Sequence, residues 1–80
     1  MTDVRLLYFA SLRDQAGCAE ETRQTTAPDL RTLYAEVQAL HGFALPVERL
    51  RVAVDGAFAH WDDPLRDGSE IAFIPPVSGG

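Results

Sequence analysis

The 80-residue sequence contains no lysine, only one cysteine and no long apolar run. All seven basic residues are arginine, so no side-chain amine is present that could be acylated to an isopeptide. Cys18 cannot form an internal disulfide, and no cysteine–histidine cluster indicates structural zinc. No apolar run approaches the roughly 18 residues that a membrane-spanning helix needs. The lone cysteine and the lack of a signal peptide predict a reducing, cytoplasmic location.

Acidic residues outnumber basic ones and give a formal net charge of −5. This balance argues against nucleic acid or an anionic membrane as a partner. It favours instead docking on a basic pocket of a partner protein, mainly through a faster association rate. The composition, 46% hydrophobic and 24% charged, is that of a globular chain, and the length suits one domain.

Strand-forming residues and turn signals predict a sheet. The expected strands are residues 4–9, 20–25, 50–54, 57–59 and 70–74. Residues 10–17 are expected to form a connector with one helical turn around Leu12, ended by Gly17. Asp55-Gly56 predicts a tight hairpin between the third and fourth strands.

One helix is expected between the second and third strands. Asp29 is a good N-cap, Gly42 supplies the C-terminal stop, and His41 suits the negative end of the helix dipole. Apolar residues recur on one stripe, namely Leu30, Leu33, Tyr34, Val37 and Leu40. The elements together predict an α+β fold in which this helix packs across a mixed four- to five-stranded sheet.

The other face of that sheet has nothing in this chain to cover it. Leu7 and Phe9 of the first strand are expected there, with Ala72 and Ile74 of the last strand. An uncovered apolar face of this kind indicates a partner protein.

The body of the chain offers no convincing catalytic or metal site. No base is placed beside Cys18 in the sequence, so it is interpreted as a small buried hydrophobe. The acidic stretch from Asp62 to Gly68 fails the spacing of a calcium loop, because Leu65 and Ile74 fall at ligand positions. Trp61 is interpreted as half-buried support beside a turn.

The C-terminal stretch is the unusual feature. Proline cannot donate to a sheet, so the last strand must end at or before Pro75, and Pro76 stiffens the base of the remaining segment. We therefore predict a folded α+β domain over residues 1–75 and a flexible Gly-Gly tail over residues 76–80, although chain ends are often merely frayed. The α-carboxylate of Gly80 is ionised at neutral pH and can attack an activated phosphate such as ATP to give an acyl-adenylate. Gly79 and Gly80 keep the tail narrow enough for another protein's channel.

Three motifs carry a family resemblance: Phe9-Ala10-Ser11-Leu12-Arg13 with Gly17, Pro64-Leu65-Arg66-Asp67-Gly68-Ser69-Glu70, and Pro75-Pro76-Val77-Ser78-Gly79-Gly80. In these motifs, and in length and element order, the chain resembles the small subunit of molybdopterin synthase. That family consists of ubiquitin-like β-grasp sulfur carriers. A terminal Gly-Gly alone is less specific, because ubiquitin-like modifiers and the thiamine sulfur carrier share it.

The resemblance implies a sulfur-donating subunit that is not itself catalytic. A ubiquitin-activating-type adenylyltransferase would use ATP to adenylate Gly80, and a sulfur donor would convert it to a thiocarboxylate. The large subunit, in a heterotetramer, would supply the active site where the sulfur enters a cyclic pyranopterin precursor to form the dithiolene. The residues inserted there would be Pro75, Pro76, Val77, Ser78 and Gly79. No cofactor or metal would be bound by the chain itself.

The resemblance also implies a partner interface with Phe9, Arg13 and Ile74 beside the tail. Ile74 stands where the family often has a larger apolar residue, and Asp55 where asparagine is common. Three alternatives stay open: a sulfur carrier of another pathway, a ubiquitin-like modifier conjugated through Gly80, and a plain interaction domain.

Overall fold

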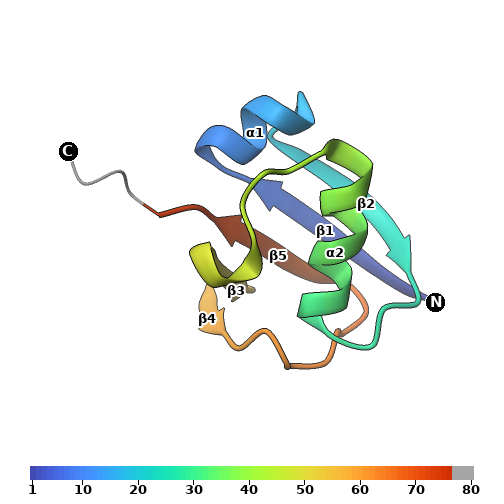
Figure 1. Ribbon diagram of the computed structural model, residues 1–80. Helices are drawn as coiled ribbons and strands as arrows, with labels where there is room; N and C mark the ends of the chain where they lie inside the picture. The colour runs from blue at the N-terminus through green and yellow to red at the C-terminus, as the bar shows by residue number, and fades with distance from the viewer. Residues whose placement is uncertain (77–80) are drawn as a thin grey trace.

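The computed structural model describes residues 1–76 (Figure 1). Its elements are β1 (Thr2–Tyr8), α1 (Ala10–Ala16), β2 (Glu20–Thr25), α2 (Leu30–His41), the 3-10 helix η1 (Val47–Arg49), β3 (Arg51–Val54), β4 (Ala57–Ala59) and β5 (Ser69–Ile74). Residues 77–80, and with them Val77, Ser78, Gly79 and Gly80 of the predicted tail, lie outside the described part. The predicted boundary after residue 75 therefore stays a prediction. Within residues 1–76, no helix is long and apolar enough to cross a membrane.

The five strands form one mixed sheet in the order β2-β1-β5-β3-β4. β1 and β5 run parallel, while every other neighbouring pair is antiparallel. α2 lies across one face of this sheet (Figure 1). The expected α+β arrangement is thus confirmed, and we call the sheet face opposite α2 the outer face.

α2 begins and ends where its capping residues predict. The Asp29 side chain accepts a hydrogen bond from the Thr32 backbone N–H at 2.8 Å, and Gly42 adopts a left-handed φ of 72°. Four of the five predicted stripe residues are buried, but Leu40 is 59% exposed and its assignment to the core was wrong. At about 100° per residue, position 41 falls nearer the centre of the stripe than position 40. His41 accordingly turns inward and contacts the ring of Tyr8.

The second helix, α1, is longer than the single turn expected from the sequence. It covers seven residues, and only Leu12 among them is buried. One buried residue leaves no apolar periodicity to detect in the sequence. Ala10, the first helical residue, has a positive φ of 50°, so the chain makes a sharp turn directly after β1. Gly17 ends the helix in a left-handed conformation, as predicted.

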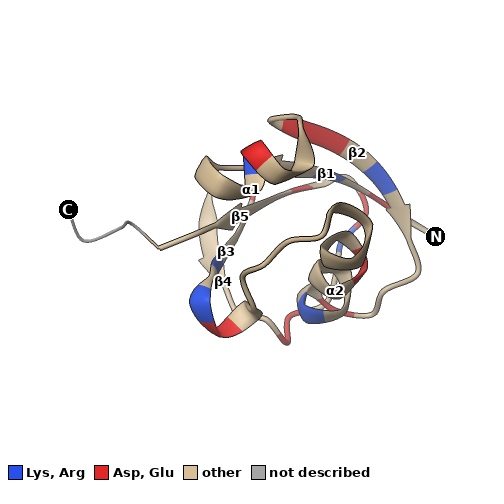
Figure 2. Cartoon of the chain, turned by 45° about the horizontal axis from the view of Figure 1, so that its top comes forward, with Lys and Arg blue, Asp and Glu red and all other residues tan. Residues whose placement is uncertain are grey.

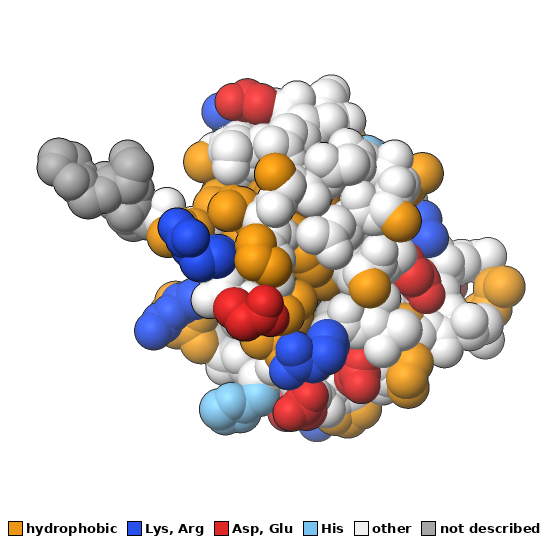
Figure 3. All heavy atoms as spheres, viewed as in Figure 1, with side chains coloured by type: hydrophobic (Ala, Val, Ile, Leu, Met, Phe, Trp, Pro, Cys, Tyr) orange, Lys and Arg blue, Asp and Glu red, His pale blue; other side chains and the backbone are white. Residues whose placement is uncertain are grey.

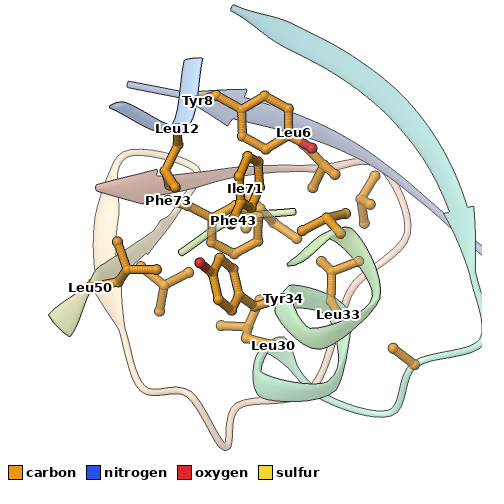
Figure 4. Packing of buried hydrophobic residues seen from close by; sticks show 14 residues of the cluster. Leu6, Tyr8, Leu12, Leu30, Leu33, Tyr34, Phe43, Leu50, Ile71 and Phe73 are labelled. Atoms are coloured by element: carbon orange, nitrogen blue, oxygen red, sulfur yellow. The ribbon is translucent and has the colours of Figure 1, made fainter. Parts of the chain in front are cut away.

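Aromatic rings fill the core between the sheet and α2 (Figure 4). Tyr34 contacts the ring of Phe73 edge-on at a centroid distance of 5.2 Å, and Tyr8 contacts Phe43 at 5.4 Å. Trp61 is half-buried and stacks on Phe73 at 6.1 Å, which confirms its supporting role. Because Phe73 lies on β5, this packing holds the central strand firmly against the helix.

A polar cluster joins β1, β2 and the end of α2. The buried Tyr8 hydroxyl donates to Glu21 Oε1 at 2.7 Å, and His41 Nε2 lies 2.9 Å from the same oxygen. Burial by itself raises the pKa of the Glu21 carboxyl, but the hydrogen bonds from His41 and Tyr8 outweigh it and hold that pKa below its usual 4.5. Glu21 therefore favours the folded state only while it is ionised.

This cluster predicts an acid-sensitive component of stability. Because the pKa of Glu21 is lower in the folded than in the unfolded chain, its contribution is complete above pH 4.5 and disappears as the pH falls through the folded value. We expect Glu21→Gln to lower the free energy of unfolding at neutral pH by about 1–3 kcal/mol. The variant should also lose less stability than the wild type on acidification, as measured by urea denaturation at several pH values.

Glu20→Gln is the matched control. Glu20 precedes Glu21 but faces solvent, where it pairs with Arg5 at 2.6 Å. An exposed pair of this kind contributes about 0–1 kcal/mol. Equal losses for the two variants at every pH would contradict a special role for Glu21.

Candidate functional site

The C-terminal segment leaves the domain from the middle of the sheet. β5 pairs with β1 on one side and β3 on the other, and its last pairing joins Ile74 to Arg51. The strand ends before Pro75, as predicted. Of the two prolines, Pro75 is half-buried and Pro76 is exposed. The chain therefore leaves the sheet at Pro75 from a strand that is hydrogen-bonded on both sides.

The outer face carries a row of apolar side chains across four strands. Phe58 of β4 lies opposite Ala53 of β3, Ala53 lies opposite Ala72 of β5, and Ala72 lies opposite Leu7 of β1. The two alanines are the small members of the row, so the surface is hollowed between Phe58 and Leu7. We call this hollow of about 280 Å³ the apolar groove; it is lined by Leu7, Phe9, Ala53, Gly56, Phe58, Glu70, Ala72 and Ile74.

The groove brings together two of the three predicted interface residues. Phe9, 45% exposed, and Ile74, half-buried, both line it. Arg13 is exposed on α1 and does not belong to the lining. Their roles in a partner interface stay predictions, whereas the uncovered apolar face expected from the sequence is present.

Phe58 is the residue that the sequence interpretation missed. Its ring is 67% exposed on the outer face and forms one wall of the groove. The signal available was an aromatic residue two positions after Gly56 of the turn, in a strand too short to show alternation. Its position in the groove becomes visible only when the hairpin of β3 and β4 is paired through β3 with β5.

A second hollow adjoins the groove at the base of the C-terminal segment. It is lined on one side by Arg49 and Arg51 and on the other by Pro75 and Pro76, with a volume of about 510 Å³. The Arg51 guanidinium lies 5.1 Å from the centre of the Phe58 ring. Figure 2 shows the basic positions of η1 and β3 at this end of the sheet, and Figure 3 shows arginine side chains beside the departing chain.

The opposite end of the outer face is polar and internally paired. Arg5 of β1 bridges Glu20 of β2 at 2.6 Å and Glu70 of β5 at 3.5 Å. The hydrogen bond and charge of Glu20 raise the pKa of Arg5. Within residues 1–76, by contrast, neither Arg49 nor Arg51 forms an ion pair.

The domain shows little else that could perform chemistry. Cys18 is half-buried against the core, with its Sγ 3.9 Å from Glu21 Oε2. Over the described residues, no three histidine, cysteine, aspartate or glutamate side chains are grouped to hold a metal ion. The arrangement suits a docking surface beside the point where the chain leaves the sheet at Pro75.

Comparison with known proteins agrees with this arrangement. The model of the ThiS family matches residues 6–80. The molybdopterin synthase sulfur carrier subunit of Escherichia coli (strain K12) is 34% identical over 80 residues, which cover 96% of this chain and 99% of that protein. The subunit of the same name from Mycobacterium tuberculosis is 32% identical over 85 residues and is covered completely, as is this chain.

Solved structures show the same architecture. A putative molybdopterin converting factor, subunit 1, from Pyrococcus furiosus superposes with a TM-score of 0.78 at 28% identity, covering 96% of this chain and all of that one. Subunits 1 and 2 of the molybdopterin-converting factor from Helicobacter pylori form a complex, one chain of which matches with a TM-score of 0.68 at 25% identity, covering 99% of this chain and all of that one. SAMP1 from Haloferax volcanii superposes with a TM-score of 0.81, covering 98% of this chain and 99% of that one. At 22% identity, this likeness shows the fold alone. The β-grasp expectation is confirmed.

The hairpin that presents Phe58 yields a test of how the groove is built. Asp55 has a φ of 51°, its Oδ1 accepts from the Glu70 N–H at 2.9 Å, and its own N–H donates to the Glu70 carbonyl at 2.8 Å. Asp55→Ala removes the acceptor and places a residue with no preference for this conformation, so we expect a loss of about 1–3 kcal/mol in the free energy of unfolding.

Asp55→Asn is the matched variant, because asparagine keeps an acceptor oxygen and tolerates positive φ. We expect its stability in thermal and urea denaturation to stay within about 0.5 kcal/mol of the wild type. If the asparagine variant were as unstable as the alanine variant, the charge of Asp55 would matter more than its turn geometry.

Proposed function

This chain belongs to the ThiS family, and from that premise we propose that it is the sulfur carrier subunit of a molybdopterin synthase. The observation that carries the proposal is the nearly full-length likeness to curated sulfur carrier subunits. The family match extends through Gly79 and Gly80, the residues that the chemistry requires. An exposed apolar groove beside the C-terminal segment supports the same function, because a carrier must dock on the proteins that charge and discharge it.

The reacting group in this proposal is the α-carboxylate of Gly80. One carboxylate oxygen attacks the α-phosphorus of ATP, a new P–O bond forms, and pyrophosphate leaves to give the acyl-adenylate. Hydrosulfide, supplied by the sulfur donor, then attacks the carbonyl carbon, the C–O bond to AMP breaks and AMP leaves, so that the chain carries a thiocarboxylate. The ATP belongs to a ubiquitin-activating-type adenylyltransferase, and the carrier binds no cofactor of its own.

The carrier then discharges its sulfur in the active site of the large subunit, where a cyclic pyranopterin precursor becomes the dithiolene. Pro75, Pro76, Val77, Ser78 and Gly79 lead Gly80 into that site. The named assembly of two subunits from Helicobacter pylori supports a large-subunit partner. We further propose a heterotetramer of two small and two large subunits, with Phe9, Arg13 and Ile74 at the interface, working in the cytoplasm.

The proposal that Gly80 carries the sulfur, while the folded domain takes no part in the chemistry, is directly testable. Chain purified from cells that make the molybdenum cofactor should include a species whose intact mass exceeds that of the unmodified chain by the difference between sulfur and oxygen. Fragmentation should place the extra mass on Gly80. Deleting Gly80 should abolish sulfur transfer to the large subunit and leave the melting temperature unchanged, because the buried core is built within residues 4–73.

A chain with one alanine added after Gly80 is the control. It keeps every native residue but moves the carboxylate, so it should fold normally and also fail to accept sulfur. Sulfur transfer by the deletion variant would overturn the proposal. Higher-mass bands that survive boiling and reductant, formed through Gly80, would instead identify a protein modifier.

A further inference from the structure

The apolar groove has the shape of a socket for one side chain. Its floor is the pair Ala53 and Ala72, of which Ala53 is only 9% exposed, whereas Phe58 beside it is 67% exposed. The walls therefore stand well above the floor. A partner that buried a flat surface here would leave the hollow empty and lose dispersion contacts over its lining. A single bulky apolar side chain, such as that of leucine, methionine or phenylalanine, fills it.

The two ends of the groove differ in charge. At one end the carboxylate of Glu70 is compensated by Arg5 at 3.5 Å. At the other end Arg51 lies against Phe58 and, in the part of the chain that is described, has no carboxylate partner. Arg49 adds a second positive charge in the adjoining second hollow, whose lining within residues 1–76 contains one carboxylate, that of Glu48. The docking end is thus locally basic although the whole chain carries a net charge of −5.

Resting on the proposed function, we propose that the large subunit fills the socket with one bulky apolar side chain and places a carboxylate against Arg51 and Arg49. A partner that covered Arg51 without an acidic group would leave a desolvated charge uncompensated, which is costly. A carboxylate there forms charge-assisted hydrogen bonds to the planar guanidinium.

The contact between the partner's carboxylate and Arg51 also fixes the orientation of the bound partner. An apolar side chain in a socket leaves the partner able to rotate, because the hydrophobic effect is not directional. A second, polar contact at one end of the groove removes that freedom. Since Arg51 is the register partner of Ile74, the contact lies directly beside the point where the chain leaves for Gly80. The carboxylate on the partner therefore sets the direction in which the tail enters the active site.

The socket is tested by filling it from the carrier's own side. Ala72→Leu adds an apolar side chain to the floor on the outer face, away from the core. Thr22→Leu is the matched control, since Thr22 is exposed on β2 and does not line the groove. Titration calorimetry with the purified large subunit should show affinity reduced at least about tenfold for Ala72→Leu and unchanged for Thr22→Leu.

The charge is tested independently with surface variants that do not threaten folding. Arg51→Gln should weaken binding about tenfold and the double variant with Arg49→Gln more strongly. Arg51→Lys should restore part of the affinity. Arg66→Gln, at an exposed arginine that lines neither the groove nor the hollow beside it, should have no effect. Wild-type affinity should fall as salt rises from about 50 to 500 mM, and the double variant should respond much less.

The outcomes separate this inference from the proposed function. If Ala72→Leu and the arginine variants bind the large subunit like wild type while deletion of Gly80 still abolishes sulfur transfer, the inference is wrong and the function stands. If the variants only dissociate a homodimer of the carrier, detected by analytical ultracentrifugation, the socket accepts a second copy and the inference is also wrong. If deletion of Gly80 has no effect on sulfur transfer, the proposed function is wrong.

Discussion

The double pairing of β5 is the constraint on which the rest of the structure depends. This strand is hydrogen-bonded to β1 and β3 on its two sides, so it cannot shift without breaking both ladders. Its alternation sends Ile71 and Phe73 into the core and Ala72 and Ile74 to the outer face. A slip of one residue would exchange the two sets, exposing Phe73 and burying the floor of the groove. One strand thus fixes the core, the apolar groove and the point where the chain leaves the sheet.

The groove follows from residue size along one row of the sheet. Ala53 and Ala72 add little to strand stability, since larger β-branched residues pack better on a sheet surface. Because their side chains are small, they leave the space between Phe58 and Leu7 that forms the groove. The hairpin at Asp55, hydrogen-bonded to Glu70, holds Phe58 at the edge of that space. The core supplies stability independently, through the aromatic contacts between Tyr34, Phe73 and Trp61 in the other layer.

Features with a local cause, including the hairpin at Asp55-Gly56, were predictable from the sequence, and features that arise from the pairing of strands distant in the chain were not. Asp29 and Gly42 act within their own turns, and Pro75 stops a strand by lacking an N–H, so each was assigned correctly. Phe58 and Arg51 enter the site only because β4 and β5 both pair with β3. Leu40 was misplaced because His41, although polar, turns inward to satisfy Glu21. The uncovered outer face was foreseen, but neither its socket nor its charge.

In the function proposed above, docking through the groove and reaction through the tail are energetically complementary. Fixing the segment from Pro75 to Gly80 in a partner's site costs about 1–2 kcal/mol per residue in backbone entropy, less at the two prolines. Contacts of the narrow Gly79 and Gly80 cannot offset this cost, because they have no side chains to bury. A groove that binds first makes tail insertion intramolecular, so the effective concentration of Gly80 at the site is high even when each contact is weak. Weak contacts also permit release, which a carrier needs because it must leave one protein before it can serve the next.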